Sequence, residues 1–165
     1  MDKNRYFIDL ADHIAAASTC CRRKVGCILV DSNGIILATG YNGVASGLPH
    51  CNRPFIEIQI DRSEKTSYPN ACEGAFLPSG TGLDKCQAIH AEQNALMQCP
   101  DIHKIHSCYV TTSPCIHCVK MLMNTSCENI FFKEEYSHEK SMDMWLDSGT
   151  EKGLNRLWSR VYVDS

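Results

Sequence analysis

The sequence has no long apolar run, no excess of one charge and no low-complexity tract, and each absence excludes a class of protein. No segment of the 165 residues approaches 18 consecutive apolar residues, so no membrane-spanning helix is predicted. Charges are spread through residues 1–17 without a basic end followed by an apolar run, which argues against a secretory signal. We therefore expect a soluble chain in the cytoplasm.

The charge balance gives no general attraction to polyanions. The net charge is −3 and the pI about 6.1, so we expect neither a nucleic-acid polymer nor a membrane as partner, and any phosphate site must be local. Hydrophobic residues make up 44% and charged residues 21%, which is near the average of globular proteins. The length predicts a single domain over residues 1–165.

Apolar spacing predicts an α/β fold. Intervals of three and four favour a helix within residues 3–19, and the apolar runs 25–30 and 35–40 flank an Asn33-Gly34 pair that favours a hairpin turn. Beyond residue 87 the predicted order is helix 90–98, strand 108–111, helix 115–125, strand 129–133, helix 139–147 and strand 160–163. This order implies a parallel crossover and a three-layer α/β/α domain around a mixed sheet of about five strands.

Between these parts, residues 42–87 form an insert in which regular periodicity is lost. Glycine, proline, serine and asparagine alternate there with scattered cysteines. Irregular segments of this length are usually functional or fastened from outside, so we expect an ordered insert with a specific role.

Cysteine is abundant, and its spacing indicates metal chemistry. Eleven cysteines cannot all pair within one chain, and in a reducing compartment thiols serve metals or catalysis more readily than disulfides. Cys115 and Cys118 lie three residues apart at a predicted helix start, where the helix dipole stabilises thiolates. With His90 they supply the three protein ligands of a catalytic zinc, whose fourth position is kept for water.

Glu92 gives this cluster a catalytic interpretation. His90 and Glu92 do not share a face of a regular helix, so both reach one site only at an irregular first turn. There the Glu92 carboxyl group can take a proton from an activated water and return it to a substrate. A redox pair or half of a structural zinc knuckle remains open for Cys115 and Cys118, but neither explains Glu92.

Together these residues form the H-x-E and P-C-x-x-C signature of zinc nucleobase deaminases, as His90-Ala91-Glu92 and Pro114-Cys115-Ile116-His117-Cys118. Over about residues 15–138 the chain resembles the deoxycytidylate deaminase family of phage and bacterial type. The further segments that carry the resemblance are Val25-Gly26-Cys27-Ile28-Leu29-Val30, Gly40-Tyr41-Asn42-Gly43, Gln93-Asn94-Ala95 and the segment 109–118. The resemblance implies a cytidine-deaminase-like fold and a hydrolase that acts on the C–N bond of a cyclic amidine. The expected reaction converts dCMP to dUMP and ammonia and supplies dUMP for thymidylate synthesis.

The same resemblance implies contacts with the nucleotide. An activated water would attack C4 of the pyrimidine, while Glu92 protonates N3 and then the departing amine. The backbone around Ala91 and Ser113 would contact the base edge. Asn42 would lie near the sugar and Tyr136 near the nucleotide, although a plain turn and core packing remain open for these two.

Regulation is also implied by the resemblance. Family members are typically hexamers that dCTP activates and dTTP inhibits, with Mg²⁺ accompanying the triphosphate. The expected effector residues are Arg22, Arg23, Lys24, Gly40, Tyr41, Asn42 and Gly43. Surface solvation remains open for at least one of the basic residues.

Cysteines outside the signature surround the insert. Cys20, Cys51 and Cys86 lie at family-like positions for a second, structural zinc, and Cys72 and His50 compete for the remaining place. Ordinary free or buried thiols remain the alternative. The cysteines expected only to pack in the core are Cys27, Cys99, Cys108 and Cys127.

Two other functions compete with this interpretation. A deaminase of another nucleoside, base or tRNA would use unchanged metal chemistry, although the acidic balance disfavours tRNA. A noncatalytic zinc-binding scaffold would retain the fold but would have no need for the Glu92 carboxylate.

Overall fold

The computed structural model describes residues 1–51, 55–58, 61–67, 72–78, 81–82, 84–136 and 139–163. The elements follow in the order α1 (Lys3–Ala15), β1 (Gly26–Val30), β2 (Ile36–Tyr41), β3 (Gly43–Val44), β4 (Phe55–Ile58), β5 (Glu64–Ser67), β6 (Ala88–Ile89), α2 (Ala91–Gln98), β7 (Ser107–Thr112), α3 (Ile116–Met123), β8 (Asn129–Glu134), α4 (Glu139–Lys152) and β9 (Leu157–Arg160). None of the helices in these ranges is long and apolar enough to cross a membrane.

A mixed sheet of five strands forms the centre, in the order β2-β1-β7-β8-β9. Strand β1 pairs antiparallel with β2 and with β7, whereas β8 lies parallel to both β7 and β9. The chain passes from β7 to β8 through α3, which confirms the predicted parallel crossover.

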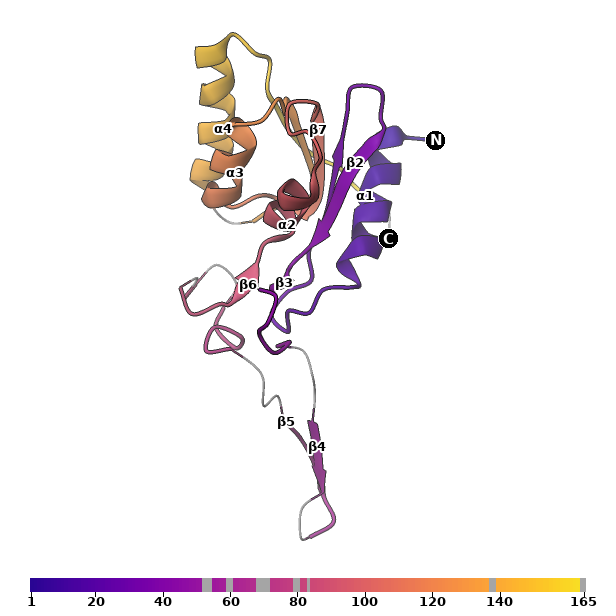
Figure 1. Cartoon of the computed structure of the whole chain (residues 1–165), viewed down its shortest axis with the longest axis vertical. Coiled ribbons are helices and arrows are strands. Elements are labelled where there is room, and N and C mark those ends of the chain that lie inside the picture. Colours follow the sequence, from indigo (N-terminus) through magenta and orange to yellow (C-terminus); the bar gives the residue numbers. More distant parts are fainter. Residues whose placement is uncertain are drawn as a thin grey trace.

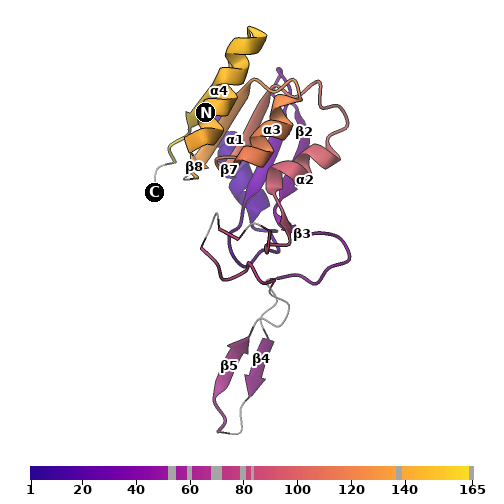
Figure 2. The same ribbon diagram turned by 90° about the vertical axis from the view of Figure 1, so that its left-hand side faces the viewer.

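Both faces of the sheet are covered, because successive strand residues point to opposite sides. In β1, Cys27 and Leu29 belong to a core with α2, α3 and α4, whereas Ile28 and Val30 pack with α1. Figures 1 and 2 show α1 on one side of the sheet and the other three helices on the opposite side. The predicted α/β/α layering is confirmed.

The last strand differs from its prediction. The expected range 160–163 was wrong, because β9 spans Leu157–Arg160 and places Leu157 opposite Asn129. Trp145 of α4 fixes this register, since its indole Nε1 donates to the Leu157 carbonyl at 3.0 Å. Helix α4 also runs beyond the predicted end at residue 147 and finishes at Lys152, next to Gly153, whose φ is +65°.

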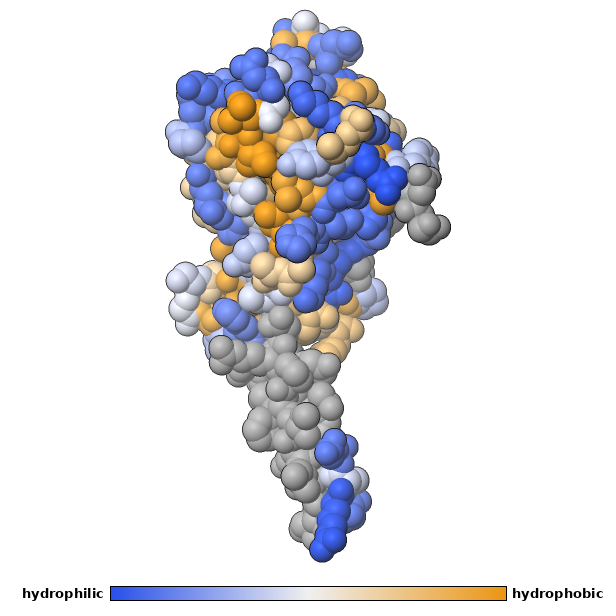
Figure 3. Space-filling model, turned by 90° about the vertical axis from the view of Figure 1, so that its right-hand side faces the viewer, coloured by the Kyte–Doolittle hydropathy of each residue, from blue (hydrophilic) through white to orange (hydrophobic). Residues whose placement is uncertain are grey.

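The insert contains short strands that its sequence did not indicate. Strands β3 and β6 pair with each other, and β4 pairs with β5 as a hairpin. Runs of two to four residues are too short for a period to stand out, so the expectation of irregular chain was wrong there. The hairpin extends away from the sheet, and its exposed tip, residues 61–64, is hydrophilic (Figures 1–3). The remaining parts of the insert, 52–54, 59–60, 68–71, 79–80 and 83, lie outside the described residues.

Candidate functional site

One edge of the sheet gathers the predicted site residues. Strands β2, β7 and β8 all end at this edge, and β1 begins there, because β1 is antiparallel to its neighbours. Helices α2 and α3 start beside these strand ends. Open α/β sheets bind ligands at the carboxyl ends of their strands, so this edge is the expected place for a site.

His90, Cys115 and Cys118 converge at this edge. The Sγ atoms of Cys115 and Cys118 each lie 3.4 Å from His90 Nδ1. A tetrahedral zinc with ordinary bond lengths separates nitrogen and sulfur ligands by about 3.6 Å. Among the described residues this is the one group of three donors within 4.8 Å of one another. The donor set therefore fits a zinc ion.

The two helix starts explain this convergence. His90 precedes α2 with extended backbone angles, φ −71° and ψ 155°, and its backbone N–H donates to Gln93 Oε1 at 2.9 Å. Cys115 precedes α3 in the same way, with φ −70° and ψ 170°. The His90 and Cys115 side chains therefore project from positions just before a regular helix begins. This is the irregular helix start that the two-residue spacing of His90 and Glu92 predicted.

Burial and hydrogen bonds shift the titration of this cluster. Hydrogen bonds from Cys118 and His90 lower the pKa of Cys115 to about 3, and the hydrogen bond with Cys115 raises the pKa of His90. Burial raises the pKa of Glu92 to about 7, and the side chain is only 4% exposed. The site thus combines a ready thiolate with a carboxyl group that exchanges protons near neutral pH.

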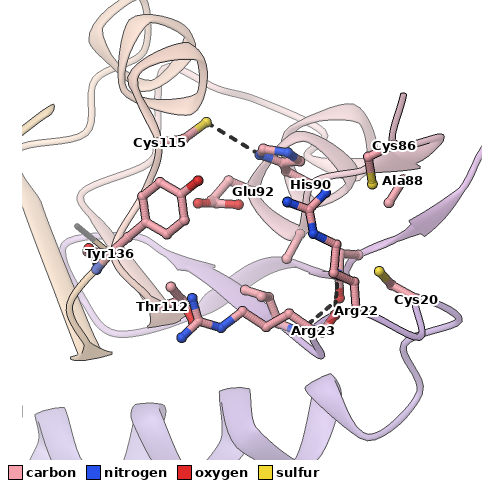
Figure 4. A pocket seen from close by; sticks show the side chains of 14 residues that line it. Cys20, Arg22, Arg23, Cys86, Ala88, His90, Glu92, Thr112, Cys115 and Tyr136 are labelled. Carbon is pink, nitrogen blue, oxygen red and sulfur yellow. Dashed lines mark hydrogen bonds between the residues drawn. The ribbon is translucent and has the colours of Figure 1, made fainter. Parts of the chain in front are cut away.

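A pocket opens over this cluster, with about 630 Å³ of empty space that includes open solvent. Figure 4 shows Glu92 between His90 and Tyr136, with Arg22 and Arg23 across the opening. The pocket is lined by Cys20, Arg22, Arg23, Val25, Asn42, Cys86, Ala88, His90, Ala91, Glu92, Thr112, Ser113, Cys115 and Tyr136.

Asn42 lines the pocket, but its side chain mainly holds the surrounding chain. Its Oδ1 accepts from the Ser18 hydroxyl at 2.6 Å and from the Val25 backbone N–H at 2.8 Å. Its Nδ2 donates to the Arg23 carbonyl at 2.6 Å. The side chain therefore joins the end of β2 to the loop that carries the arginines.

Ser113 plays a similar part on the other side. Its hydroxyl accepts from the Tyr136 backbone N–H at 2.6 Å, and its own N–H donates to the Glu134 carbonyl at 2.8 Å. Tyr136 reaches the pocket from the end of β8 (Figure 4). Ala91 lines the pocket from the first turn of α2 and has no exposed surface.

The predicted effector residues divide between the pocket and its surroundings. Arg22 and Arg23 line the pocket, whereas Lys24 points to the Ala16 carbonyl, 3.4 Å away. Tyr41 is 42% exposed. Gly40 lies against Ala91 and Ala95 of α2, and Gly43 lies against Thr19, so both glycines serve close packing.

The insert cysteines gather beside the pocket. Cys51 and Cys72 are buried together and share a hydrogen bond, and Cys86 packs against them. Burial and the neighbouring Cys20 raise the pKa of Cys21, with smaller effects from Cys72 and Cys86. His50 is exposed, so Cys72 rather than His50 lies inside this group. Cys27 and Cys108 pack in the core with their sulfurs 3.6 Å apart, and Cys127 is buried nearby, as expected.

Sequence reasoning missed several residues of this site. Thr112 could have been found, since it precedes Ser113-Pro114 at a strand end. Val25 and Ala88 carry no chemical signal of their own. Glu134 pairs with Arg23 across 111 positions of sequence, a distance over which no local pattern operates.

A partly buried histidine with two buried thiols and a buried carboxyl group, at the strand ends of a three-layer α/β fold, is typical of metal-dependent hydrolytic enzymes. The comparisons narrow this class. The model of the cytidine and deoxycytidylate deaminase zinc-binding region matches residues 1–134, and the chain belongs to that family.

Curated relatives and a solved structure agree with this placement. The deoxycytidylate deaminase of Mycobacterium phage D29 is 30% identical over 81% of this chain and 96% of its own length. The deoxycytidylate deaminase of Schizosaccharomyces pombe is 32% identical over 83% of this chain, which spans only 39% of that relative. The crystal structure of dCMP deaminase from the cyanophage S-TIM5, in complex with dCMP and dUMP, superposes with a TM-score of 0.63 at 26% identity and covers 93% of each chain.

Proposed function

We propose that this protein is a zinc-dependent deaminase that hydrolyses dCMP to dUMP and ammonia. The observation that carries the proposal is the convergence of His90, Cys115 and Cys118 beside the buried Glu92 in one pocket. His90, Cys115 and Cys118 would hold the zinc. When bound, zinc activates a water molecule for attack on the C4 atom of the pyrimidine.

Glu92 would carry the protons. A carboxyl group whose pKa lies near 7 both accepts and releases protons at neutral pH, which is the condition for efficient acid–base catalysis. Glu92 would take a proton from the attacking water, protonate N3 of the pyrimidine, and then protonate the departing amine. The added water leaves its oxygen on C4, and ammonia departs.

The remaining pocket residues would orient the nucleotide. We assign the base edge to the backbone of Ala91 and Ser113, since the hydroxyl of Ser113 already accepts from Tyr136. Tyr136 would pack near the nucleotide from the end of β8. The amide oxygen of Asn42 already accepts from Ser18 and Val25, and its amide nitrogen donates to Arg23. Asn42 would therefore contact the sugar through its second amide hydrogen.

A substrate panel tests the reaction. Zinc-loaded protein should release ammonia from dCMP faster than from deoxycytidine or CMP, as the names of the relatives suggest. Equal rates on all three substrates would refute the assignment to a deoxynucleoside monophosphate. Ammonia from a different nucleoside, base or tRNA would point to another deaminase, and no ammonia from any substrate would favour a zinc-binding scaffold.

Regulation by triphosphates is part of the proposal. By family resemblance the protein would form a hexamer that dCTP with Mg²⁺ activates and dTTP inhibits. Among the expected effector residues, Arg22, Arg23 and Asn42 line the pocket, which supports this role. Unchanged dCMP turnover with either triphosphate would contradict it.

A second zinc would fasten the insert. Cys20, Cys51, Cys72 and Cys86 are the proposed ligands, and the grouping of Cys51, Cys72 and Cys86 supports them. Within the described residues these thiols are spaced more widely than the His90 group, so they would draw together on binding.

The eleven free thiols support a reducing compartment such as the cytoplasm. We also propose that residues 1–165 act as one domain.

A further inference from the structure

Two arginines face the pocket from the same loop, and they have different partners. Arg22 donates from Nη2 to the backbone carbonyls of Pro78 and Thr81, at 2.5 and 2.7 Å. Arg23 donates from Nη2 to the Glu134 carboxylate, at 3.0 Å. Arg22 is thus held by neutral groups of the insert, whereas Arg23 is held by an anion.

Breaking the Arg23–Glu134 ion pair costs little free energy. The two side chains are 33% and 56% exposed, and ion pairs at such exposure contribute little to stability. Glu134 is the last residue of β8, at the same sheet edge as His90 and Glu92. A stronger anion that enters the pocket can therefore displace the Glu134 carboxylate from Arg23.

The main chain on both sides of the pair is fixed. The Arg23 carbonyl accepts from Asn42 Nδ2 at 2.6 Å, and the Glu134 carbonyl accepts from the Ser113 N–H at 2.8 Å. Arg22 and Arg23 line the same pocket as Tyr136, so both guanidinium groups face the space where a nucleotide would bind. An exchange of anions at Arg23 would need only side-chain rotation.

We propose that Arg23 is the specificity-determining residue for the 5′-phosphate, and that the Glu134 carboxylate occupies its guanidinium group until the phosphate displaces it. This inference rests on the proposed function. A phosphate monoester offers the same kind of oxygen acceptors as a carboxylate with more negative charge, and the guanidinium fork can bind it through two hydrogen bonds. A neutral nucleoside brings no anion to Arg23, so the pair would select for nucleotides.

The test is the ratio of kcat/KM for dCMP to kcat/KM for deoxycytidine, measured on zinc-loaded protein. Arg23→Gln should lower this ratio by at least about 10- to 100-fold, because the loss of a single charge-assisted hydrogen bond already has an effect of that size. Arg23→Lys should restore part of the ratio, because it returns the charge without the fork. Glu134→Gln should lower KM for dCMP several-fold, because the phosphate no longer competes with a carboxylate.

Glu135→Gln is the matched control. It removes a neighbouring exposed carboxylate that lies outside the pair, and KM for dCMP should stay at the wild-type value. Two results would overturn the proposal: equal losses on dCMP and deoxycytidine in Arg23→Gln, or equal changes of KM in Glu134→Gln and Glu135→Gln. The first would mean a structural role for Arg23, and the second a general charge effect.

Calorimetry separates this inference from the proposed function. Arg23→Gln should weaken binding of dUMP to the zinc-loaded protein about 10- to 100-fold relative to its effect on deoxyuridine. If the wild type released no ammonia and this binding difference were still found, the proposed function would fail and the phosphate site would stand. Equal weakening of dUMP and deoxyuridine would reject the phosphate site whatever the activity.

Discussion

Glu92 differs from an ordinary surface glutamate in its environment. Its carboxyl group is almost fully buried next to Cys118 and His90, and burial places its pKa at about 7. An amide of the same shape fills that space but cannot carry a proton. We therefore predict that Glu92→Gln lowers kcat on dCMP roughly 10²- to 10⁴-fold, the usual share of general acid–base catalysis.

The zinc content of Glu92→Gln, measured by elemental analysis, should equal that of the wild type, because Glu92 is not among the three metal donors. Near-full activity in this variant would remove Glu92 from the mechanism. Loss of zinc together with activity would assign it to metal binding instead.

Asn42 is predicted to act through the chain around it. Asn42→Ala would leave the partly buried Val25 N–H and Arg23 carbonyl without their Asn42 partner, and it would remove one acceptor of the buried Ser18 hydroxyl. Each unpaired buried polar group costs about 1–3 kcal/mol, so we expect the free energy of unfolding to fall by about 2–4 kcal/mol in urea titrations. A change below about 0.5 kcal/mol, the range of ordinary surface substitutions, would show that these bonds contribute nothing.

At this scale the sequence predicts the residues whose chemistry is local. His90 with Glu92, and Cys115 with Cys118, are recognisable because each pair lies within four positions and within one helix start. Two features were not predictable: the hydrogen bonds by which Asn42 joins the end of β2 to the arginine loop, and the ion pair of Arg23 with Glu134. Both depend on which strand ends meet in space.

Among the elements, α1 and α2 are brought to the sheet by two glycines. A Cβ on Gly40 would lie 2.3 Å from the Ala91 carbonyl oxygen of α2, and one on Gly26 would lie 2.0 Å from the Ala11 carbonyl oxygen of α1. Both distances are too short for packing against a rigid backbone. Helix α2 positions His90 and Glu92, whereas α1 packs on the opposite face.

We predict that Gly40→Ala and Gly26→Ala each lower the free energy of unfolding by about 1–3 kcal/mol, the usual cost of overpacking. Only Gly40→Ala should also weaken zinc binding, because only it displaces the helix that follows His90. Zinc affinity measured by competition with a chromogenic chelator distinguishes the two. Equal zinc affinity in both variants would mean that α2 can shift without moving the metal donors.

An element was predictable from the sequence when it was long enough to show a period and when its position did not depend on residues far along the chain. Helices and strands with several apolar residues in period, such as α1 and β7, were predicted within a few residues. Strand β9 was misplaced because its register depends on Trp145, which belongs to α4. The pairs β3–β6 and β4–β5 were missed because their strands hold at most four residues and draw on partners within the insert.

Over the whole molecule, the insert connects the pocket to a cysteine group and a projecting hairpin. Arg22 of the pocket binds the Pro78 and Thr81 carbonyls of the insert, and Cys86 lines the pocket while packing against Cys51 and Cys72. The β4–β5 hairpin lies far from this region in both views (Figures 1 and 2). A two-stranded hairpin alone is only marginally stable, so the order of the insert must come from its base.

The cysteine group is the natural source of that order. A structural zinc closes a loop with four thiolates and contributes to folding directly, whereas free thiols contribute only their burial. We therefore predict two zinc ions per chain by elemental analysis of protein purified under reducing conditions. Cys51→Ser should retain one zinc and should be cleaved within residues 42–87 by limited proteolysis. Cys99→Ser, whose sulfur lies outside both groups, should keep two zinc ions and the wild-type cleavage pattern. One zinc in the wild type would show that thiol packing alone orders the insert, whereas two in Cys51→Ser would show that Cys51 is not a zinc ligand.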